Sequence, residues 1–484
     1  NQQKLIKEYQ KLQIAKNSIY IADDYSLFKE DEIKQLNSKS FNNFERSKKI
    51  DNKLQELEKK IKSQIPEYFS KLKPKGVGLN SIQKNLSESQ VFLEYFFFDQ
   101  ATYAIIIKKD NYELIKIDIS KSKLLNLSEK IKSTLHLDTN GNLAKFDINS
   151  AHKLHELIFK PLKSHIGNSR NIILVPNNFL NYIPLQILPK NKSNNCFDCS
   201  KINWLKDDYN FTYIPNSEFF RFKENKKIKV PRLLNLKNKS YYLGIGNPNL
   251  EPIKNDLEVK NTNKITKMLR GNNFLKDTSE IDKLYGNVYG SEEELNEIKN
   301  ILSPLKSDLL LGNEANEKNI KSKNLQDYEI IHFATHGELA GFLEGQNEPF
   351  LVLTPPEIGS DVNDGLLTLS EIMNLELNTK LIILSACNTA SNNIKEAEGF
   401  TGLARAFLYS GSKSVMVSNW YVESNSAKEL TTNFIKNLKQ SKTNNFSEAL
   451  SLSMKKLSSD KDTSHPFFWG PFVIVGLENN LNLN

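Results

Sequence analysis

Apolar residues recur at helical spacing near the beginning of the chain. They follow one another at intervals of four, three and four residues, while Lys and Glu occupy many of the positions between them. This spacing predicts an amphipathic helix with one apolar stripe, which needs a surface to pack on. It indicates either a helix that covers the domain behind it or the end of a helical repeat array. A single helix pair does not distinguish these two interpretations, because a repeat is recognised only from several copies. Residues 1–72 are expected to form this helical segment, and its stripe consists of Ile50, Leu54, Leu57 and Ile61.

From about residue 75 the helical spacing gives way to short β-branched and aromatic runs separated by turn residues. Such runs are typical of neighbouring strands. Residues 73–234 are therefore expected to form a small α/β unit with a helix around Ala151–Phe159, in which the polar stretch 190–201 is a surface loop. The expected strands lie at 91–98, 102–109, 112–118, 171–176 and 211–215.

Strands and helices alternate regularly in the rest of the chain. Near-continuous apolar strands joined through helices imply a mostly parallel sheet that helices cover on both faces. The expected fold class is therefore α/β, and residues 235–484 are expected to form a second α/β unit. Its strands are expected at 241–248, 308–312, 329–337, 381–387, 414–420 and 471–476, and its helices from Glu292, around Asn319, at 402–408 and at 427–438.

The composition is that of a globular protein with more than one core. Hydrophobic residues make up 39% and aromatic residues 10% of the 484 residues, a length at which one core gives way to two or more packed units. No apolar run approaches about 18 residues, so we expect no membrane span and no membrane partner. The first residue is Asn1 rather than Met, and the chain is expected to be part of a longer protein.

Charge and cysteine content argue against two further classes of protein, nucleic-acid-binding proteins and small secreted proteins. The net charge of +8 comes from Lys and Arg spread over the whole length rather than from one basic stripe, which does not favour a nucleic-acid partner. Three cysteines in 484 residues do not make the disulfide framework of a small secreted protein. A reducing, cytoplasmic location is expected.

Two of the apolar strands end in reactive side chains. His336 follows the run IIHFAT and Cys387 follows LIILSA. In open α/β sheets the carboxyl ends of the strands are where ligands bind, so both side chains can face one crevice. A lone Cys or His is more often structural, but the shared position of this pair favours a Cys–His dyad.

The motifs around this pair occur in an ordered series that resembles the CHAT family, caspase-like peptidases related to separases, caspases and gingipains. The likeness covers about residues 75–476. It implies a caspase-like sheet flanked by helices, with the unit at 73–234 as a catalytically silent half, and a place as the C-terminal part of a longer TPR–CHAT-like protein. The motifs are FLEYFFFD, NIILVPNNFLNYIPLQILP, FTYIPNS, YYLGIGNPN, HFATHGE, DGLLTLSEI, LSACNTA, EGFTGLARAFLYSGSKSVMVSNW and HPFFWGPFVIVG.

The resemblance also implies a role for each residue of the site. Cys387 would be the nucleophile, and it needs a nearby cation or helix N-terminus because an ordinary thiol is mostly protonated at neutral pH. His336 would activate the thiol and protonate the leaving amine. The backbone N–H groups of Gly337 and Cys387 would form the oxyanion hole.

The sequence departs from the family where the substrate side chain is expected to bind. Many relatives carry an Asp shortly after the Trp that matches Trp420, whereas this chain has Glu423, Ser424 and Asn425. If Ser424 replaces that Asp, a basic substrate residue loses its counter-ion unless Glu398 or Glu423 supplies one. These five residues are the candidate substrate-binding set.

The remaining histidines and cysteines that stand out are interpreted as structural. His332 lies within a strand, and His465 opens a packing turn before the last strand. Cys196 and Cys199 have the CxxC spacing of a metal site, but no second pair and no nearby histidine completes four ligands. No metal and no cofactor is expected.

The resulting hypothesis is a regulated cysteine endopeptidase that cleaves specific protein substrates, in bacterial antiviral defence or programmed cell death. Its expected partners are a protein substrate, for which a neighbouring gene is one source, and an activating sensor or upstream domain. Two alternatives stay open. One is a catalytically silent scaffold or binding module with the same fold, and the other is an acyltransferase or amidase that uses the same thiol.

Overall fold

A computed structural model describes most of the chain. The described residues form two compact units, one within residues 5–65 and one within 77–477. None of the helices in the described ranges combines the length and the hydropathy that a membrane crossing requires. The described residues are 5, 8, 9, 43–65, 77–138, 141–220, 241–250, 288–338, 346, 348–356, 363–385, 401–440 and 445–477.

Within the described part of the first unit, the residues of the apolar stripe form a helix, as their spacing predicts. Its main element is α3 (Asn43–Gln64), which ends two residues before Pro66, where the proline ring prevents a helix from continuing. The Tyr9 hydroxyl donates a hydrogen bond to Glu58 Oε1 at 3.1 Å. All four side chains of the predicted stripe are buried, namely Ile50, Leu54, Leu57 and Ile61.

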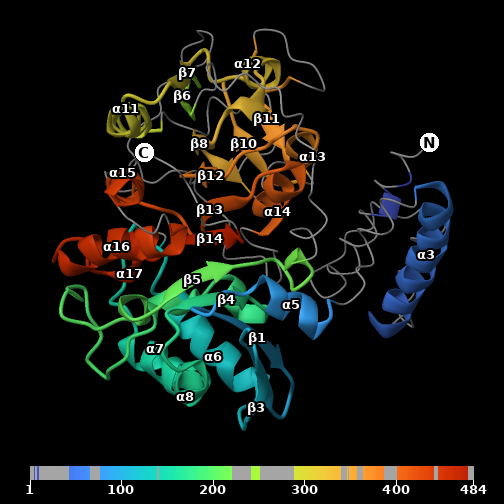
Figure 1. Ribbon diagram of the computed structural model, residues 1–484, viewed down its shortest axis with the longest axis vertical. Coiled ribbons are helices and arrows are strands. Elements are labelled where there is room, and N and C mark those ends of the chain that lie inside the picture. The colour runs from blue at the N-terminus through green and yellow to red at the C-terminus, as the bar shows by residue number, and fades with distance from the viewer. Residues whose placement is uncertain are drawn as a thin grey trace. The chain divides into compact units, whose positions relative to one another are not determined.

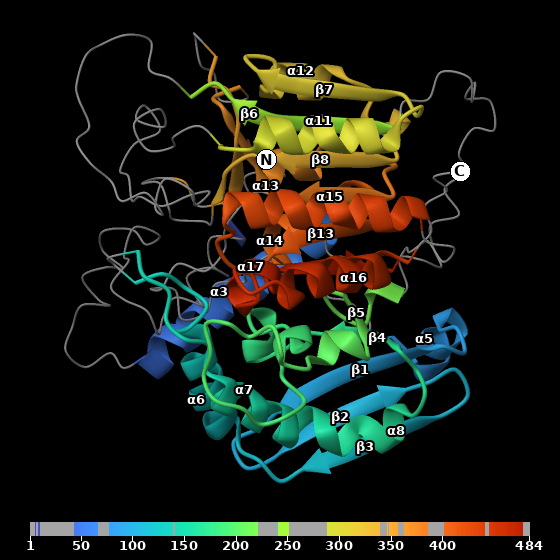
Figure 2. The same ribbon diagram turned by 90° about the vertical axis from the view of Figure 1, so that its left-hand side faces the viewer.

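The second unit is built on one sheet of eleven strands, in the order β3-β2-β1-β4-β5-β14-β13-β12-β8-β6-β7 (Figures 1 and 2). The pairs β3–β2, β2–β1 and β14–β13 are antiparallel and the other neighbours are parallel, which confirms the predicted mostly parallel sheet. The strands are β1 (Gln90–Phe97), β2 (Thr102–Ile107), β3 (Tyr112–Ile117), β4 (Asn171–Val175), β5 (Asn210–Tyr213), β6 (Tyr242–Pro248), β7 (Ser307–Gly312), β8 (Ile330–Ala334), β12 (Leu381–Leu384), β13 (Ser414–Ser418) and β14 (Phe472–Gly476).

Helices cover both faces of this sheet, as the continuous apolar strands require. Figure 2 shows α11 (Ser291–Leu302), α15 (Ser424–Gln440) and α16 (Phe446–Ser459) side by side on one face, and Figure 1 shows α13 (Leu369–Met373) and α14 (Thr401–Ser410) on the opposite face. The apolar spacing did not predict α16 or α6 (Lys121–Lys132). The other helices are α5 (Leu79–Asn85), α7 (Ile148–Leu154), α8 (Lys163–Ile166), α12 (Glu317–Ser322) and α17 (Pro466–Trp469).

The alternation of side chains along β1 shows how one strand serves both faces. Val91 and Leu93 enter the main core, whereas Phe92 between them enters a second, smaller cluster with Ile107 and Ile173. Successive residues of a strand point to opposite faces, so an unbroken apolar run is stable only where both faces are covered. In the middle of the sheet, all four residues of β12 are buried.

The predicted α/β units at 73–234 and 235–484 share this single sheet. The last strand, β14, pairs with β13 on one side and with β5 on the other, where Ile474 lies opposite Thr212. The C-terminal strand therefore joins the sheet of the upstream unit directly. The boundary near residue 234 stays a prediction.

A small second sheet lies beyond the carboxyl end of β8. It consists of β9 (Gly337–Glu338), β10 (Phe350–Val352) and β11 (Leu366–Thr368), in the order β11-β10-β9 with antiparallel neighbours. The backbone N–H of Val352 donates to the His336 carbonyl at 2.8 Å, so this sheet begins at the predicted catalytic histidine.

Gly411 lies in the turn between α14 and β13, where the backbone of Leu377 comes so close that only glycine fits. Its φ is +124°, and an added Cβ would lie 2.0 Å from the Leu377 carbonyl oxygen. We expect Gly411→Ala to lower the free energy of unfolding by about 3 kcal/mol, from backbone strain and displaced backbone together.

The matched control is Gly312→Ala, because Gly312 also has a positive φ, of +54°, but nothing lies within 4 Å of its added Cβ. Strain alone should lower the free energy of unfolding by about 1 kcal/mol there. Urea denaturation measures both variants. Equal losses would show that the close approach to Leu377 is not what requires glycine.

Candidate functional site

His336 lies directly past the carboxyl end of β8 and is buried, with 4% of its surface exposed. The strand ends because its apolar run stops at Ala334, and Thr335 and His336 lead into β9. The Thr335 hydroxyl donates a hydrogen bond to the Val352 carbonyl. Both neighbours of the imidazole in sequence are therefore held, one by this hydrogen bond and the other, Gly337, by pairing with β10.

The strand that precedes Cys387 lies next to β8. Strands β12 and β8 are parallel and in register, with Leu384 opposite Phe333. The Ser385 N–H donates to the Phe333 carbonyl at 3.1 Å. His336 comes three residues after Phe333, and Cys387 comes three residues after Leu384. Cys387 itself lies outside the described residues.

A buried polar network lies behind His336, within the sheet. His332 Nε2 is 2.9 Å from Ser385 Oγ and 3.1 Å from Glu294 Oε1, and His332 Nδ1 is 3.1 Å from the Tyr242 hydroxyl. Burial raises the pKa of Tyr242 well above its usual range, so the hydroxyl stays protonated and can donate to Nδ1. The Glu294 carboxylate also accepts a hydrogen bond from Thr431 Oγ1 at 2.8 Å.

This network joins four elements around the candidate site. Its side chains come from β6, β8, α11 and α15, together with the residue that follows β12, and the side chains of His332 and Glu294 are fully buried. A buried carboxylate is stable only when it is paired and hydrogen-bonded, which is the case here. The interpretation of His332 as a structural residue therefore has a physical reason. Its ring links β8 to Ser385, two residues before Cys387.

Glu294 is a residue that the sequence analysis missed. A signal for it exists: Glu294 lies on the same face of α11 as Leu295, Ile298 and Leu302, which are buried. A carboxylate at a position of the apolar stripe of a helix needs a buried polar partner, because an unpaired one is strongly destabilising. The partner His332 is distant in sequence, so the signal points to a buried network without identifying its other member.

Glu317, also missed, holds the segment that leads into the small sheet. One of its carboxylate oxygens accepts the backbone N–H groups of Asp364 and Gly365, both at 2.8 Å, and the other accepts Lys321 Nζ at 2.7 Å. Burial raises the pKa of Glu317 above its ordinary value. Because β11 begins at Leu366, this carboxylate fixes the start of a strand that connects through β10 to Gly337.

The predicted substrate-binding residues have different environments. Trp420 is buried, and its Nε1 donates to the Phe467 carbonyl at 3.1 Å. Glu423 caps helix α15, since its two carboxylate oxygens accept the N–H groups of Asn425 and Ser426 at 2.9 and 2.8 Å. Ser424 is buried and Asn425 is exposed. Glu398 lies outside the described residues.

The other side chains that stood out in the sequence have structural contacts. His465 caps the short helix α17, because its Nδ1 accepts the Phe467 N–H at 3.1 Å, and burial lowers the pKa of His465 to about 4. Cys196 and Cys199 form a disulfide, which the sequence analysis did not predict. Cys199 is buried, and its N–H donates to Ser464 Oγ at 2.8 Å, so the loop at 190–201 is tied to the segment before α17.

Comparison with known proteins places these elements in a family. The model of the CHAT domain matches residues 149–477, which confirms the resemblance. Human Tetratricopeptide repeat protein 28 is 28% identical over 226 residues, which are 41% of this chain and 9% of the human protein. The mouse protein of the same name is 27% identical over the same shares. The chain thus spans less than a tenth of the length of these curated relatives.

Two solved structures are reported among those that resemble this chain. The Saccharomyces cerevisiae separase–securin complex is 12% identical, with 82% of this chain and 31% of that chain covered and a TM-score of 0.44. The pro- and mature domains of Porphyromonas gingivalis RgpB are 11% identical, with 74% of this chain and 77% of that chain covered and a TM-score of 0.38.

Proposed function

Because the chain belongs to the CHAT domain family, whose members are caspase-like peptidases, we propose that it is a cysteine endopeptidase with Cys387 as nucleophile and His336 as acid and base. The observation that carries the proposal is the register of β8 and β12. Phe333 and Leu384 are paired across these adjacent parallel strands and lie three residues before His336 and Cys387, respectively, in the sequence, which supports the pairing of the two side chains. That edge is where open α/β sheets bind their ligands.

In the proposed reaction, the Cys387 thiolate attacks the scissile carbonyl carbon and forms a carbon–sulfur bond. The backbone N–H groups of Gly337 and Cys387 stabilise the resulting oxyanion. His336 passes a proton to the amine as the carbon–nitrogen bond breaks, and the acyl group stays on sulfur as a thioester. Water, deprotonated by His336, then hydrolyses the thioester and returns the free thiol.

The buried network and the small sheet support this proposal by holding the two strand ends. The network of His332 and Glu294 reaches Ser385, two residues before Cys387. The Glu317 carboxylate and strands β11 and β10 hold Gly337 from the other side. A dyad needs its members fixed to within a fraction of an ångström, and buried, hydrogen-bonded supports provide that.

The proposed partners follow from the relatives. We infer a protein substrate, for which a neighbouring gene is one source, and an activating segment upstream, because the curated relatives carry the name of tetratricopeptide repeat proteins and extend far beyond the matched part. A role in bacterial antiviral defence or programmed cell death is part of the same proposal. The test is co-expression with the neighbouring gene products and mass-spectrometric mapping of new chain termini, with the Cys387→Ala variant as the reference. Identical termini in both samples contradict the proposal.

Substrate preference is a separate prediction. Both carboxylate oxygens of Glu423 are occupied by N–H groups at the start of α15, and Ser424 offers only a neutral hydroxyl. Burying a charged Arg or Lys side chain without an acidic partner costs several kcal/mol. We therefore expect cleavage after uncharged or small residues.

A panel of peptides that differ only at the residue before the cut measures this preference. Glu423→Gln should leave the ranking of the peptides unchanged, since Gln still accepts a backbone N–H. A preference for Arg or Lys that disappears in Glu398→Gln or Glu423→Gln would contradict the prediction and identify the acidic partner.

A further inference from the structure

A cluster of three side chains with metal-ligating atoms lies in the upstream half, on the helix that the sequence predicts around 151–159. They are His152, His155 and Glu156, and their ligand atoms all lie within 4.8 Å of one another. Helix α7 ends at Leu154 and continues into a π-helical turn, His155–Phe159. Such turns are rare and are enriched at functional sites.

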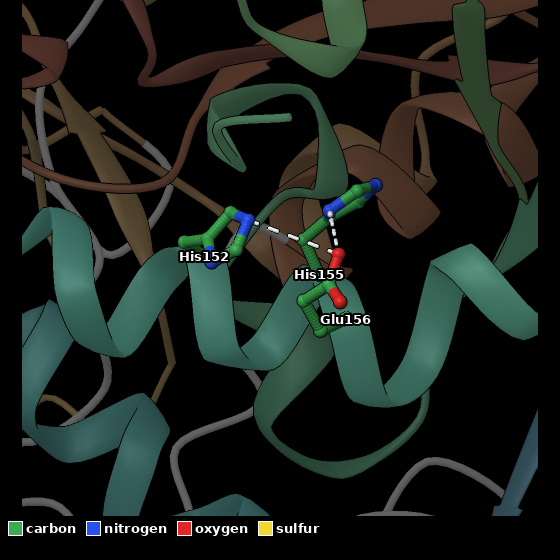
Figure 3. A group of neighbouring side chains, drawn as sticks. All are labelled: His152, His155 and Glu156. Carbon is green, nitrogen blue, oxygen red and sulfur yellow. Dashed lines mark ion pairs between the residues drawn. The ribbon is translucent and has the colours of Figure 1, made fainter. Parts of the chain in front are cut away.

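The two imidazole rings face the same carboxylate oxygen. His152 Nε2 is 3.7 Å and His155 Nδ1 is 3.8 Å from Glu156 Oε1, and Figure 3 shows both lines converging on that atom. These separations are too long for hydrogen bonds. In a tetrahedral zinc site, with metal–ligand distances of about 2.0–2.2 Å, the ligand atoms lie about 3.3–3.5 Å apart. Small side-chain rotations therefore suffice to bring the three atoms around one ion.

A second observation points to a ligand. The side chain of His155 is only 9% exposed, and its Nδ1 finds no hydrogen-bond partner among the described residues. A buried polar nitrogen without a partner is destabilising, so native proteins rarely contain one.

We propose that His152, His155 and Glu156 form a binding site for a divalent transition-metal ion such as Zn²⁺, with two imidazole nitrogens and one carboxylate oxygen as ligands. This donor set suits Zn²⁺, Co²⁺ and Ni²⁺, and a water molecule completes the tetrahedron. His152 is 19% and Glu156 31% exposed, which gives an ion access from solvent. The proposal departs from the expectation, drawn from the cysteine pair, that the chain binds no metal.

One neighbour competes with the ion. Lys160 Nζ lies 2.8 Å from Glu156 Oε2, the carboxylate oxygen that the rings do not face. The Lys160 side chain is 60% exposed, so it can turn into solvent when a cation binds. Removing its charge should strengthen metal binding, because one positive charge beside the site is lost and the carboxylate becomes free for the ion.

The experiment uses the full chain without a polyhistidine tag, in the Cys387→Ala background so that no free thiol binds metal. The disulfide of Cys196 and Cys199 is kept oxidised. After treatment with EDTA and its removal, the chain is titrated with Zn²⁺ in a calorimeter and with Co²⁺ under a spectrophotometer. We expect one equivalent of either ion to bind, with the Co²⁺ absorption of a tetrahedral site and an increase in Tm.

Variants identify the ligands. Loss of a group that supports a metal ligand typically weakens metal binding by about 10- to 100-fold. His152→Ala and Glu156→Gln remove proposed ligands themselves, so each should weaken Zn²⁺ binding by at least that much. Both residues are partly exposed, so these variants keep the test valid if His155→Ala fails to fold. Lys160→Met should bind more tightly than the parent chain.

The matched control is His165→Ala, which removes a histidine whose Nδ1 lies 2.7 Å from Glu113 Oε2. That pair has no third ligand within the searched, described residues, so its loss should leave the affinity unchanged. The proposal is overturned if the parent chain binds no stoichiometric ion, if His152→Ala and Glu156→Gln bind as the parent does, or if His165→Ala is equally impaired.

Discussion

Cys387→Ala is expected to abolish peptide-bond cleavage and to leave the free energy of unfolding nearly unchanged. The thiolate sulfur of Cys387 forms the bond of the acyl-enzyme, and no other group in the proposed dyad can replace it. The side chain removed is small, and its loss takes away little packing. Peptide turnover and urea denaturation, measured on the same preparation, separate the two effects. Turnover equal to that of the parent chain in Cys387→Ala would refute the assignment of the nucleophile.

His336→Ala should lower kcat/KM on the order of 10⁴-fold, because both activation of the thiol and protonation of the leaving amine are lost. A readout specific to the dyad is the pH dependence of Cys387 alkylation. In the parent chain, alkylation should already proceed at a pH below the pKa of an ordinary thiol, which is about 8.5. In His336→Ala, the midpoint of the pH profile should rise to that value. His165→Ala, which removes a histidine from α8, is the control and should retain both properties. An unchanged alkylation profile in His336→Ala contradicts the pairing.

Glu294→Ala is expected to lower the free energy of unfolding by about 3–5 kcal/mol, because it leaves His332 buried and without its carboxylate partner. The side chains of both residues are fully buried, with Oε1 3.1 Å from Nε2. The matched control is Glu297→Ala, one turn further along the same helix. Glu297 binds Lys436 of α15 at 2.8 Å, but both side chains are 43% exposed, and such a pair contributes about 1 kcal/mol or less.

The coupling between Glu294 and His332 is measured by a double-mutant cycle. The variant that carries both Glu294→Ala and His332→Ala should be more stable than the sum of the two single losses predicts. In the double variant, neither the carboxylate nor the imidazole is left buried without its partner. Urea denaturation of the four proteins gives the coupling free energy. Additive losses, or a loss in Glu294→Ala no larger than in Glu297→Ala, would show that the buried pair does not hold α11 to β8.

The elements around the site were largely predictable because their signals are local. An apolar run that stops at Ala334 and another that stops at Leu384 indicate two buried strands, and the reactive side chains follow directly. Helix α11 was expected from Glu292, and it begins at Ser291. By contrast, the strands of the small sheet are only two or three residues long, and such short segments show no readable period.

The partners of the buried polar groups were not predictable. Glu294 binds His332, and Glu317 binds the N–H groups at 364–365, so each pair joins elements that are distant along the chain. Periodicity tells which face of a helix is buried but not what lies against it. The same holds for His155, whose Nδ1 is buried without a hydrogen bond because of how the chain packs around it.

The sequence by itself determined the α/β class, the strands of the large sheet, the family resemblance and the positions of His336 and Cys387 shortly after two apolar runs, because each of these depends on neighbouring residues. Only the tertiary structure decided that β12 lies beside β8 in register and that β14 returns antiparallel to join the upstream half. Strand order follows from which buried faces and backbone hydrogen bonds are satisfied together, and that balance is a property of the whole folded chain.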